Sequence, residues 1–321
     1  GLLQHIIHRP ESDNEIDTKA LLWDTIREAI PFIVTGSAIQ LFQIIDQMTY
    51  SNVMSWITNF SRSELLVQFS YFSANPNKIT MILIAVATSI GGVGIPLLTE
   101  NYVKGDFRAA GKLVQDNLTM LVAFLLPATI GAVAIAEPLY TVFYGKPDSL
   151  ALGLFILAML QTIILGLYTV LSPMIQALFQ NRKAILYFGY GVLVKLILQV
   201  PFIYFFKAYG PLLSTTIGLM IPIVLMYKEI HVVTKFNRKT VFKRSLLTAI
   251  LTFIMLLVVL LSALILGFVL KPNGRVTSMI YVALIGGVGI VVYGGLGLRL
   301  RFLDRFIGSK AASLRNKFHI S

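Results

Sequence analysis

Residues Ile79–Gly145 read ITMILIAVATSIGGVGIPLLTENYVKGDFRAAGKLVQDNLTMLVAFLLPATIGAVAIAEPLYTVFYG, and this stretch decides the fold class of the chain. Two apolar runs, Ile79–Leu98 and Asn117–Ala136, flank a short charged hairpin. Each run is about as long as the roughly 20 residues that a helix needs to cross a bilayer. The second run ends in Glu137-Pro138, followed by aromatic residues and a glycine. This pattern is typical of a helix that leaves the apolar layer at the headgroups.

The composition extends this interpretation to the whole chain. Of its 321 residues, 56% are hydrophobic and only 13% are charged, and the mean hydropathy is +0.78. A soluble domain carries about 25% charged residues. We therefore predict an all-α, polytopic transmembrane helix bundle. The absence of cysteine excludes disulfides, thiolate nucleophiles and cysteine metal sites. We assign the net charge of +12 to loops that orient a membrane protein, and we expect no nucleic-acid partner.

Apolar runs of spanning length predict about eight transmembrane helices. They are expected at Ile26–Thr49, Ile79–Leu98, Asn117–Ala136, Ser149–Leu171, Ala184–Phe206, Gly210–Ile230, Leu246–Leu270 and Val276–Leu298. The amphipathic segment Thr18–Thr25 is expected to lie on the membrane surface ahead of the first span. The aromatic-rich connection 50–78 is interpreted as a loop resting on the headgroups, in preference to a lid or an interfacial helix.

The predicted loops differ in charge from one side of the membrane to the other. Most of the 27 lysines and arginines fall in the N-terminal segment, the 99–116 hairpin, the connections near 182 and 235–244, and the tail after 298. Such a bias places this side, and both termini of the segment, in the cytoplasm. The tail 299–321 interleaves its basic residues with phenylalanines, so we expect it to contact an anionic lipid surface.

Gly36, Gln40, Gln43 and Gln47 form a polar stripe along the first predicted span. At 100° per residue they fall within about 60° of one another, and three amides are costly when they face lipid. We expect the stripe to line a polar cavity that binds substrate oxygens. The alternative is amide bonding between helices, which contributes about a kcal/mol or less per bond. Asp46 lies about 80° to the side of the stripe and is a candidate gate or coupling-ion residue.

Lys195 lies near the middle of the predicted span 184–206, about 16 Å from either end, and Gln199 follows one turn later. A lysine side chain cannot reach the interface from that depth, so its amine must meet water or a partner. We expect Lys195 and Gln199 to line a central cavity in which the amine attracts a lipid diphosphate. The alternative is a buried structural ion pair or a neutral amine. We place Asp46 and Glu137 near the outer ends of their spans, so no carboxylate is expected beside Lys195.

For the remaining candidate residues, we favour structural interpretations over functional ones. Glu137 is a second candidate gate or coupling-ion residue, although we favour a helix end whose carboxylate is solvated at the interface. His5 and His8 lack a third ligand, so no metal is expected. The Gly-Gly-Val-Gly-Ile segments at 91 and 286 lack the context of a nucleotide site and are interpreted as helix-packing positions. We expect no cofactor and no catalytic residue.

The hairpin PLLTENYVKGDFRAAG followed by EPLYTVFYG resembles the MOP superfamily of lipid-linked oligosaccharide flippases, and within it the MurJ-like, SpoVB/YtgP-type branch of Gram-positive bacteria. The resemblance covers roughly Ile26 to Arg299, and its clearest pieces are Pro96–Leu98, Gly105–Phe107, Glu137–Gly145 and Gln176–Lys183. It implies two six-helix lobes plus two further helices. This chain then corresponds to residues 1–25 as a connector, 26–236 as the C-terminal lobe, 237–298 as the additional pair and 299–321 as a basic cytoplasmic tail. The N-terminal lobe of the same protein is the implied partner.

The resemblance also implies a function: flipping of an undecaprenyl-diphosphate-linked cell-wall precursor, with lipid II as the first candidate, by alternating access across the cytoplasmic membrane. Alternatives within transport are an exporter of other lipid-linked oligosaccharides and a multidrug antiporter of the same superfamily. An antiporter of cationic drugs would require acidic residues in its cavity, which the predicted cavity residues do not supply. A membrane glycosyltransferase or polymerase, or a non-transporting scaffold, is the alternative from a different class.

Overall fold

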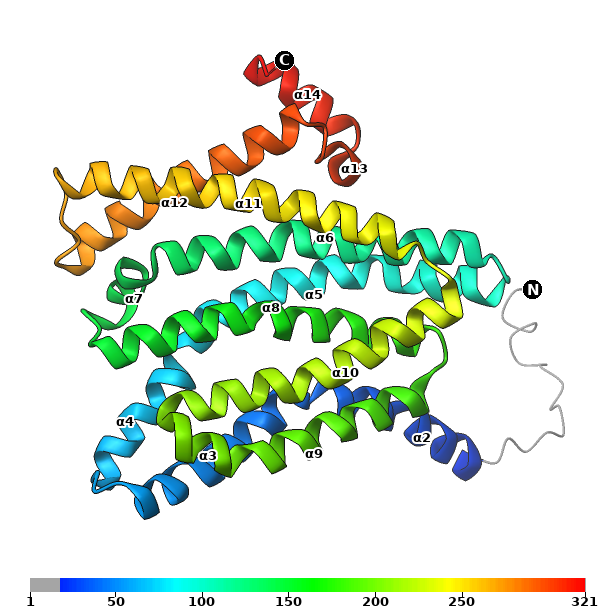
Figure 1. Cartoon of the computed structure of the whole chain (residues 1–321). Helices are drawn as coiled ribbons and strands as arrows, with labels where there is room; N and C mark the ends of the chain where they lie inside the picture. Colours follow the sequence, from blue (N-terminus) through cyan, green and yellow to red (C-terminus); the bar gives the residue numbers. More distant parts are fainter. Residues whose placement is uncertain (1–17, 321) are drawn as a thin grey trace, which may run out of the picture.

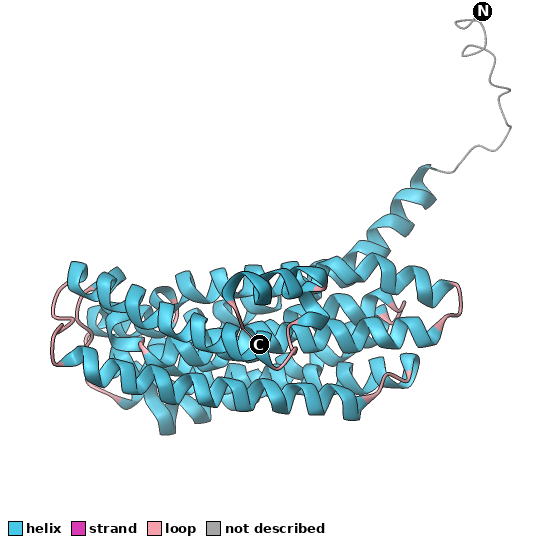
Figure 2. Ribbon diagram, turned by 90° about the horizontal axis from the view of Figure 1, so that it is seen from above, coloured by secondary structure: helices cyan, strands magenta, loops and turns pink. Residues whose placement is uncertain are grey.

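The computed structural model describes residues 18–320, and all regular secondary structure in this part of the chain is helical. The elements are α2 (Thr18–Gly36), α3 (Ala38–Ile57), α4 (Arg62–Phe72), α5 (Ala74–Val103), α6 (Phe107–Ala134), α7 (Ala136–Tyr144), α8 (Ser149–Ala177), α9 (Asn181–Phe206), the 3-10 turn η1 (Lys207–Tyr209), α10 (Gly210–Thr234), α11 (Arg238–Gly267), α12 (Arg275–Arg299), α13 (Asp304–Ile307) and α14 (Ser309–Phe318). The long helices lie side by side along one direction, with the connections at two opposite ends (Figures 1 and 2). His5 and His8 lie outside the described residues.

The described helices confirm the predicted polytopic bundle. Six helical segments between residues 18 and 320 are long and apolar enough to cross a membrane, or seven if the bent pair α2–α3 is one span. One of these segments, 181–234, comprises α9 and α10, which double back at η1 and pack along their length (Figure 1). With α9 and α10 taken separately, the helices fit a bundle of about eight spans.

The first predicted span is broken rather than straight. The axes of α2 and α3 differ by 55° across Ser37, where a Gly-Ser pair interrupts the helix, a common cause of sharp kinks. Two side chains of α8 form hydrogen bonds to Thr35, next to the break. The Tyr168 hydroxyl donates to the Thr35 carbonyl at 3.0 Å, and the Gln176 amide donates to the Thr35 hydroxyl at 2.9 Å. The amphipathic segment 18–25 is the first part of α2 and continues without interruption into the span.

The interpretation of residues 50–78 as a loop on the headgroups is wrong. The segment is mostly helical, because α3 continues to Ile57 and α4 begins after a capping box in which Ser61 and Glu64 satisfy each other's backbone N–H groups. Tyr50 and Phe72 are buried, and the Tyr50 hydroxyl donates to Gln68 Oε1 at 2.7 Å. Aromatic side chains that were expected at the headgroups therefore pack α4 onto the bundle.

The hairpin that decides the fold class joins α5 to α6. Gly105 adopts a positive φ of 75°, which glycine tolerates without strain. Asp106 caps α6 by accepting a hydrogen bond from the Ala109 N–H at 3.1 Å. At the other end of α6, the chain turns at Ile135 into the short helix α7, and Glu137 is exposed in its first turn.

The C-terminal tail folds back toward α12. Arg315 on α14 bonds the Asp304 carboxylate and, at 3.3 Å, the Leu298 carbonyl near the end of α12. The hydrogen bond from Arg315 lowers the pKa of the Asp304 carboxyl below its usual value. Contact of this tail with an anionic lipid surface remains a prediction.

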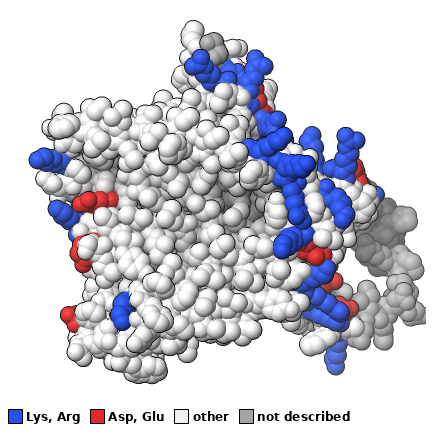
Figure 3. Space-filling model, viewed as in Figure 1, with Lys and Arg blue, Asp and Glu red and all other residues white. Residues whose placement is uncertain are grey.

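Lysine and arginine side chains gather at one end of the bundle, which carries the α5–α6 and α10–α11 connections (Figures 1 and 3). We call this the basic end. The α7–α8 and α11–α12 connections lie at the opposite end (Figure 1). The positive-inside rule predicts that the basic end is cytoplasmic.

This orientation can be tested directly because the chain has no cysteine of its own. Arg182→Cys and Arg238→Cys at the basic end are expected to be shielded from an impermeant thiol reagent in intact cells. Lys146→Cys and Asn273→Cys at the opposite end are expected to react. All four should react after permeabilisation, and the reverse pattern in intact cells would overturn the orientation.

Candidate functional site

A buried ion pair lies at the centre of α3, α9 and α10. Lys195 on α9 is completely buried, and its ammonium bonds the carboxylate of Asp46 on α3. Three oxygens of α10 complete its surroundings: the Pro211 carbonyl at 3.1 Å and the hydroxyls of Ser214 and Thr215, both at 2.9 Å. An ammonium carries three protons, so this cage of four oxygens fully occupies it.

Gln199 closes the network around the same carboxylate. Its amide donates to Asp46 Oδ1 at 2.9 Å and to the Thr49 hydroxyl at 2.8 Å. Its carbonyl oxygen accepts from Ser214 at 2.6 Å. Every member therefore has a partner on another helix. Such a network avoids the cost of several kcal/mol that an unpaired ion would carry in an apolar interior.

Two glycines allow α9 and α10 to come close enough for this network. A Cβ at Gly191 would lie 2.6 Å from the Gly218 carbonyl oxygen, closer than real Cβ atoms approach. A Cβ at Gly218 would lie 3.0 Å from the Gly191 carbonyl oxygen and 3.1 Å from the Lys195 Cβ. Small residues at a membrane helix contact let the backbones approach. Here they bring the Lys195 side chain within reach of the α10 hydroxyls.

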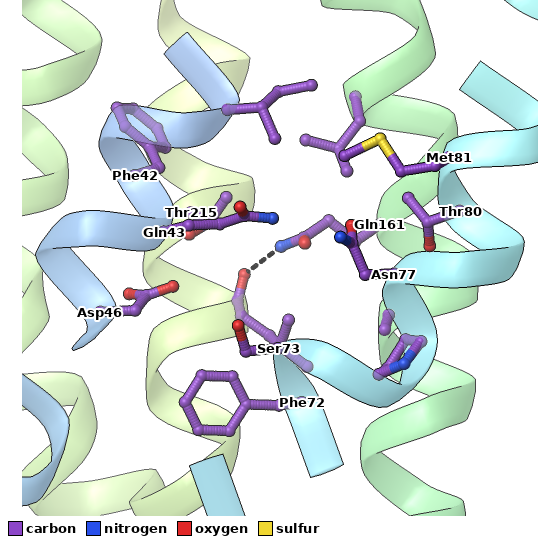
Figure 4. A pocket seen from close by; sticks show the side chains of 15 residues that line it. Phe42, Gln43, Asp46, Phe72, Ser73, Asn77, Thr80, Met81, Gln161 and Thr215 are labelled. Carbon is purple, nitrogen blue, oxygen red and sulfur yellow. Dashed lines mark hydrogen bonds between the residues drawn. The ribbon is translucent and has the colours of Figure 1, made fainter. Parts of the chain in front are cut away.

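A small polar cavity adjoins the pair. Its volume is about 50 Å³, and its walls come from α3, α5, α8 and α10 with the end of α4. Gln43 and Gln161 point toward each other across it, and Asp46 and Asn77 also border it (Figure 4). Gln161 donates to the Leu212 carbonyl at 2.6 Å and to the Thr216 hydroxyl at 3.0 Å. This space accommodates a few water molecules but not a sugar diphosphate.

The structure separates the predicted site residues into two groups. Asp46 and Gln43 border the cavity, and Lys195 and Gln199 lie behind Asp46. The second group is exposed: Gln40 and Gln47 on α3 and Glu137 on α7. The prediction that no carboxylate accompanies Lys195 is wrong, because α3 continues to Ile57 and Asp46 is therefore in its middle. In this conformation the lysine forms the buried ion pair that was the alternative interpretation.

Asn77, Thr80 and Thr215 also border the cavity, although the sequence alone did not predict them. Asn77 was hidden because residues 50–78 were interpreted as an outer loop, whereas it lies in the first turns of α5. The signal that could have revealed it is the paired asparagines around Pro76 directly ahead of an apolar run. No group of three or more His, Cys, Asp or Glu residues that could hold a metal occurs within residues 18–320.

A separate apolar groove lies between α6, α11 and α12. It measures about 460 Å³ and is lined almost entirely by apolar side chains, with Pro127, Met255 and Val259 among them. Gly286 and Gly289, from the second glycine-rich segment, also border it. These glycines widen the groove because they place no side chain in it.

The chain is similar to a protein of known function. It is 28% identical over 297 residues to Lipid II flippase MurJ of Bacillus subtilis (strain 168), a match that covers 91% of this chain and 54% of that protein. The chain therefore spans about half the length of this curated relative. No family model and no solved structure matches the chain. The likeness confirms the resemblance to the MurJ-like flippases of the MOP superfamily.

The buried pair makes a prediction about stability. Asp46→Asn and Lys195→Met each leave one buried charge without its partner, and each is expected to lower the free energy of unfolding by about 3–5 kcal/mol. The double variant removes both charges and is expected to recover most of that loss. Unfolding of the detergent-solubilised protein, followed by circular dichroism, measures all three.

The exposed pair of Lys104 and Glu100, 2.5 Å apart, provides the control. Water screens both of these groups, so Lys104→Met is expected to lower the free energy of unfolding far less than Lys195→Met does. If Lys195→Met and Lys104→Met cost the same, or if the double variant is no more stable than the single variants, the central network does not stabilise the bundle as described.

Proposed function

We propose that this chain forms the second lobe of a flippase that moves an undecaprenyl-diphosphate-linked cell-wall precursor across the cytoplasmic membrane, with lipid II as the specific substrate. The observation that carries the proposal is the similarity to Lipid II flippase MurJ along 91% of the chain. This relative is a transporter, which agrees with the expectation that the chain is not an enzyme. The N-terminal lobe as partner and the Gram-positive origin are part of the same proposal.

The exposed amides of α3 support a substrate path on the face of this lobe. Gln40 and Gln47 are exposed on the bundle, and amide groups that face lipid are costly. We propose that this face of α3 borders the hydrated cavity between two lobes, where the amides bind sugar or phosphate oxygens. The 50 Å³ cavity behind α3 is then a hydrated space within the lobe and not the substrate site itself.

The ion pair changes the role expected for Lys195, which was that of a free cation in a central cavity. Its ammonium is already neutralised by Asp46, so it meets a diphosphate only after that contact is broken. The bend between α2 and α3 and the close α9–α10 contact give the lobe parts that can move against each other. Release of Asp46 would expose a cation when the headgroup arrives, and re-pairing would expel the headgroup. Asp46 thereby acts as a gate, while the exposed Glu137 is a weaker candidate for a coupling-ion site.

The apolar groove between α6, α11 and α12 supports a lipid-linked substrate. A polyprenyl chain is apolar along its length, and a groove of about 460 Å³ with apolar walls can hold part of it while the headgroup crosses in the polar path. An exporter of other lipid-linked oligosaccharides would use the same features and differs only in the sugar. A drug antiporter is less well supported, because the carboxylate at the cavity is neutralised by Lys195.

The amide stripe provides the test of this proposal. In cells that depend on the whole protein, Gln40→Leu with Gln47→Leu is expected to lower flipping roughly 5- to 150-fold, since each lost hydrogen bond contributes about 0.5–1.5 kcal/mol. The measurement is the accessibility of the lipid-linked precursor on the outer leaflet, with the protein level quantified alongside. Met48→Leu, an exposed position on the same helix, removes no polar group and should flip normally.

Normal flipping by the double glutamine variant at normal abundance would contradict the proposed path along α3. The same assay tests Lys195. The neutral Asp46→Asn/Lys195→Met variant is expected to remain folded but to lose flipping at least tenfold, because no cation can be released. If it flips normally, the pair is structural only.

A further inference from the structure

A second groove, distinct from both the cavity and the large apolar groove, lies between α6, α8, α10 and α11. It measures about 300 Å³ and shares no lining residue with either of them. Its apolar walls are Leu118, Val122, Leu167, Leu171, Ile223, Val224 and Val241, with Tyr227 beside them. Val224 is 44% exposed, so the groove opens to the surface of the bundle.

Two cations border the same groove. Lys228 lies near the end of α10, and Arg238 is the first residue of α11. Both are exposed, and both lie beside the α10–α11 connection, which is at the basic end of the bundle (Figure 1). No carboxylate forms a salt bridge with either residue within 18–320, whereas Lys183 and Arg244 nearby in sequence are each paired. The Arg238 guanidinium lies 6.0 Å from the centre of the Tyr227 ring, which holds it beside the groove.

This combination has the chemistry of one kind of ligand. An apolar slot that opens to the bundle surface fits an acyl chain, and two uncompensated cations at the end of that slot fit a phosphate. Basic pockets between transmembrane helices are recognised binding sites for anionic lipid headgroups. A zwitterionic headgroup satisfies its phosphate with its own ammonium and adds a positive charge that the two cations repel. A second protein would require a larger surface than this groove offers.

We propose that this groove binds one anionic glycerophospholipid, with an acyl chain between α8 and α10 and its phosphate between Lys228 and Arg238. The bound lipid would bridge α10 and α11, which are joined only by residues 235–237. It would thereby fix the additional helix pair against the six-helix body. The site takes a lipid of the surrounding membrane, and it does not depend on the identity of the transported substrate.

Quenching of a single tryptophan by brominated lipids tests the site. Val224→Trp places the probe at the groove, in a protein in which every other tryptophan is replaced by phenylalanine, including the exposed Trp23 and Trp56 of this chain. The whole protein is reconstituted in vesicles with brominated phosphatidylglycerol or brominated phosphatidylcholine of the same chain length. Phosphatidylglycerol is expected to bind more tightly, because each cation near the membrane surface contributes roughly fivefold.

Lys228→Ala with Arg238→Ala is then expected to remove at least fivefold of that preference. The matched control is Lys239→Ala with Lys243→Ala. These two residues are exposed on the same helix α11, carry the same charge and do not line the groove. The control is expected to keep the preference, and high salt should weaken it.

Three results would overturn the proposal. Equal quenching by the two brominated lipids means that the groove does not recognise the anionic headgroup. Equal loss in the two charge variants means that the preference comes from the general surface charge. Quenching by neither lipid means that another segment or another copy covers the groove. Circular dichroism of each variant checks that the fold is retained.

Discussion

The pairing of Asp46 with Lys195 constrains the geometry at the centre of this bundle. A bare ammonium or carboxylate at that depth would cost several kcal/mol, so each ion can be buried only where the other and enough oxygen acceptors are within reach. That requirement sets the register of α3 against α9. It also places Ser214 and Thr215 of α10 around the ammonium. The close contact of Gly191 with Gly218 follows from the same need, because larger residues would move the hydroxyls out of reach.

The two ends of the bundle differ in the side chains that they carry. The basic end carries the charged connections and the groove bordered by Lys228 and Arg238. At the opposite end, the aromatic pairs Tyr50–Phe72 and Tyr140–Phe155 pack α4 and α7 against their neighbouring helices. Between these ends, a buried polar network joins α3, α9 and α10. This is the arrangement expected of a membrane protein in which lipid, rather than water, surrounds most of the surface.

The sequence predicted the spans well, because apolar length alone determines whether a helix can cross a bilayer. It predicted the inward face of α3 poorly. The prediction placed the face with the three glutamines toward the protein interior. The buried face is instead the one whose residues recur every fourth position: Ala38, Phe42, Asp46 and Tyr50. An amide is polar enough to suggest a protein-facing stripe, but only the packed structure shows which face meets α9. Likewise, no sequence spacing reveals that Lys195 and Asp46, far apart in the chain, are partners.

Flipping by the purified whole protein tests the central claim most directly. Lipid II is placed in the inner leaflet of sealed vesicles that contain the protein, and its appearance outside is followed with an impermeant reagent that reacts with the headgroup. Lipid II is expected to become accessible at a rate well above that in protein-free vesicles. If lipid II stays inaccessible while another lipid-linked oligosaccharide is flipped, the assignment of lipid II as the substrate is wrong. If neither lipid is flipped, although circular dichroism shows that the protein is folded, the assignment of flippase activity is wrong.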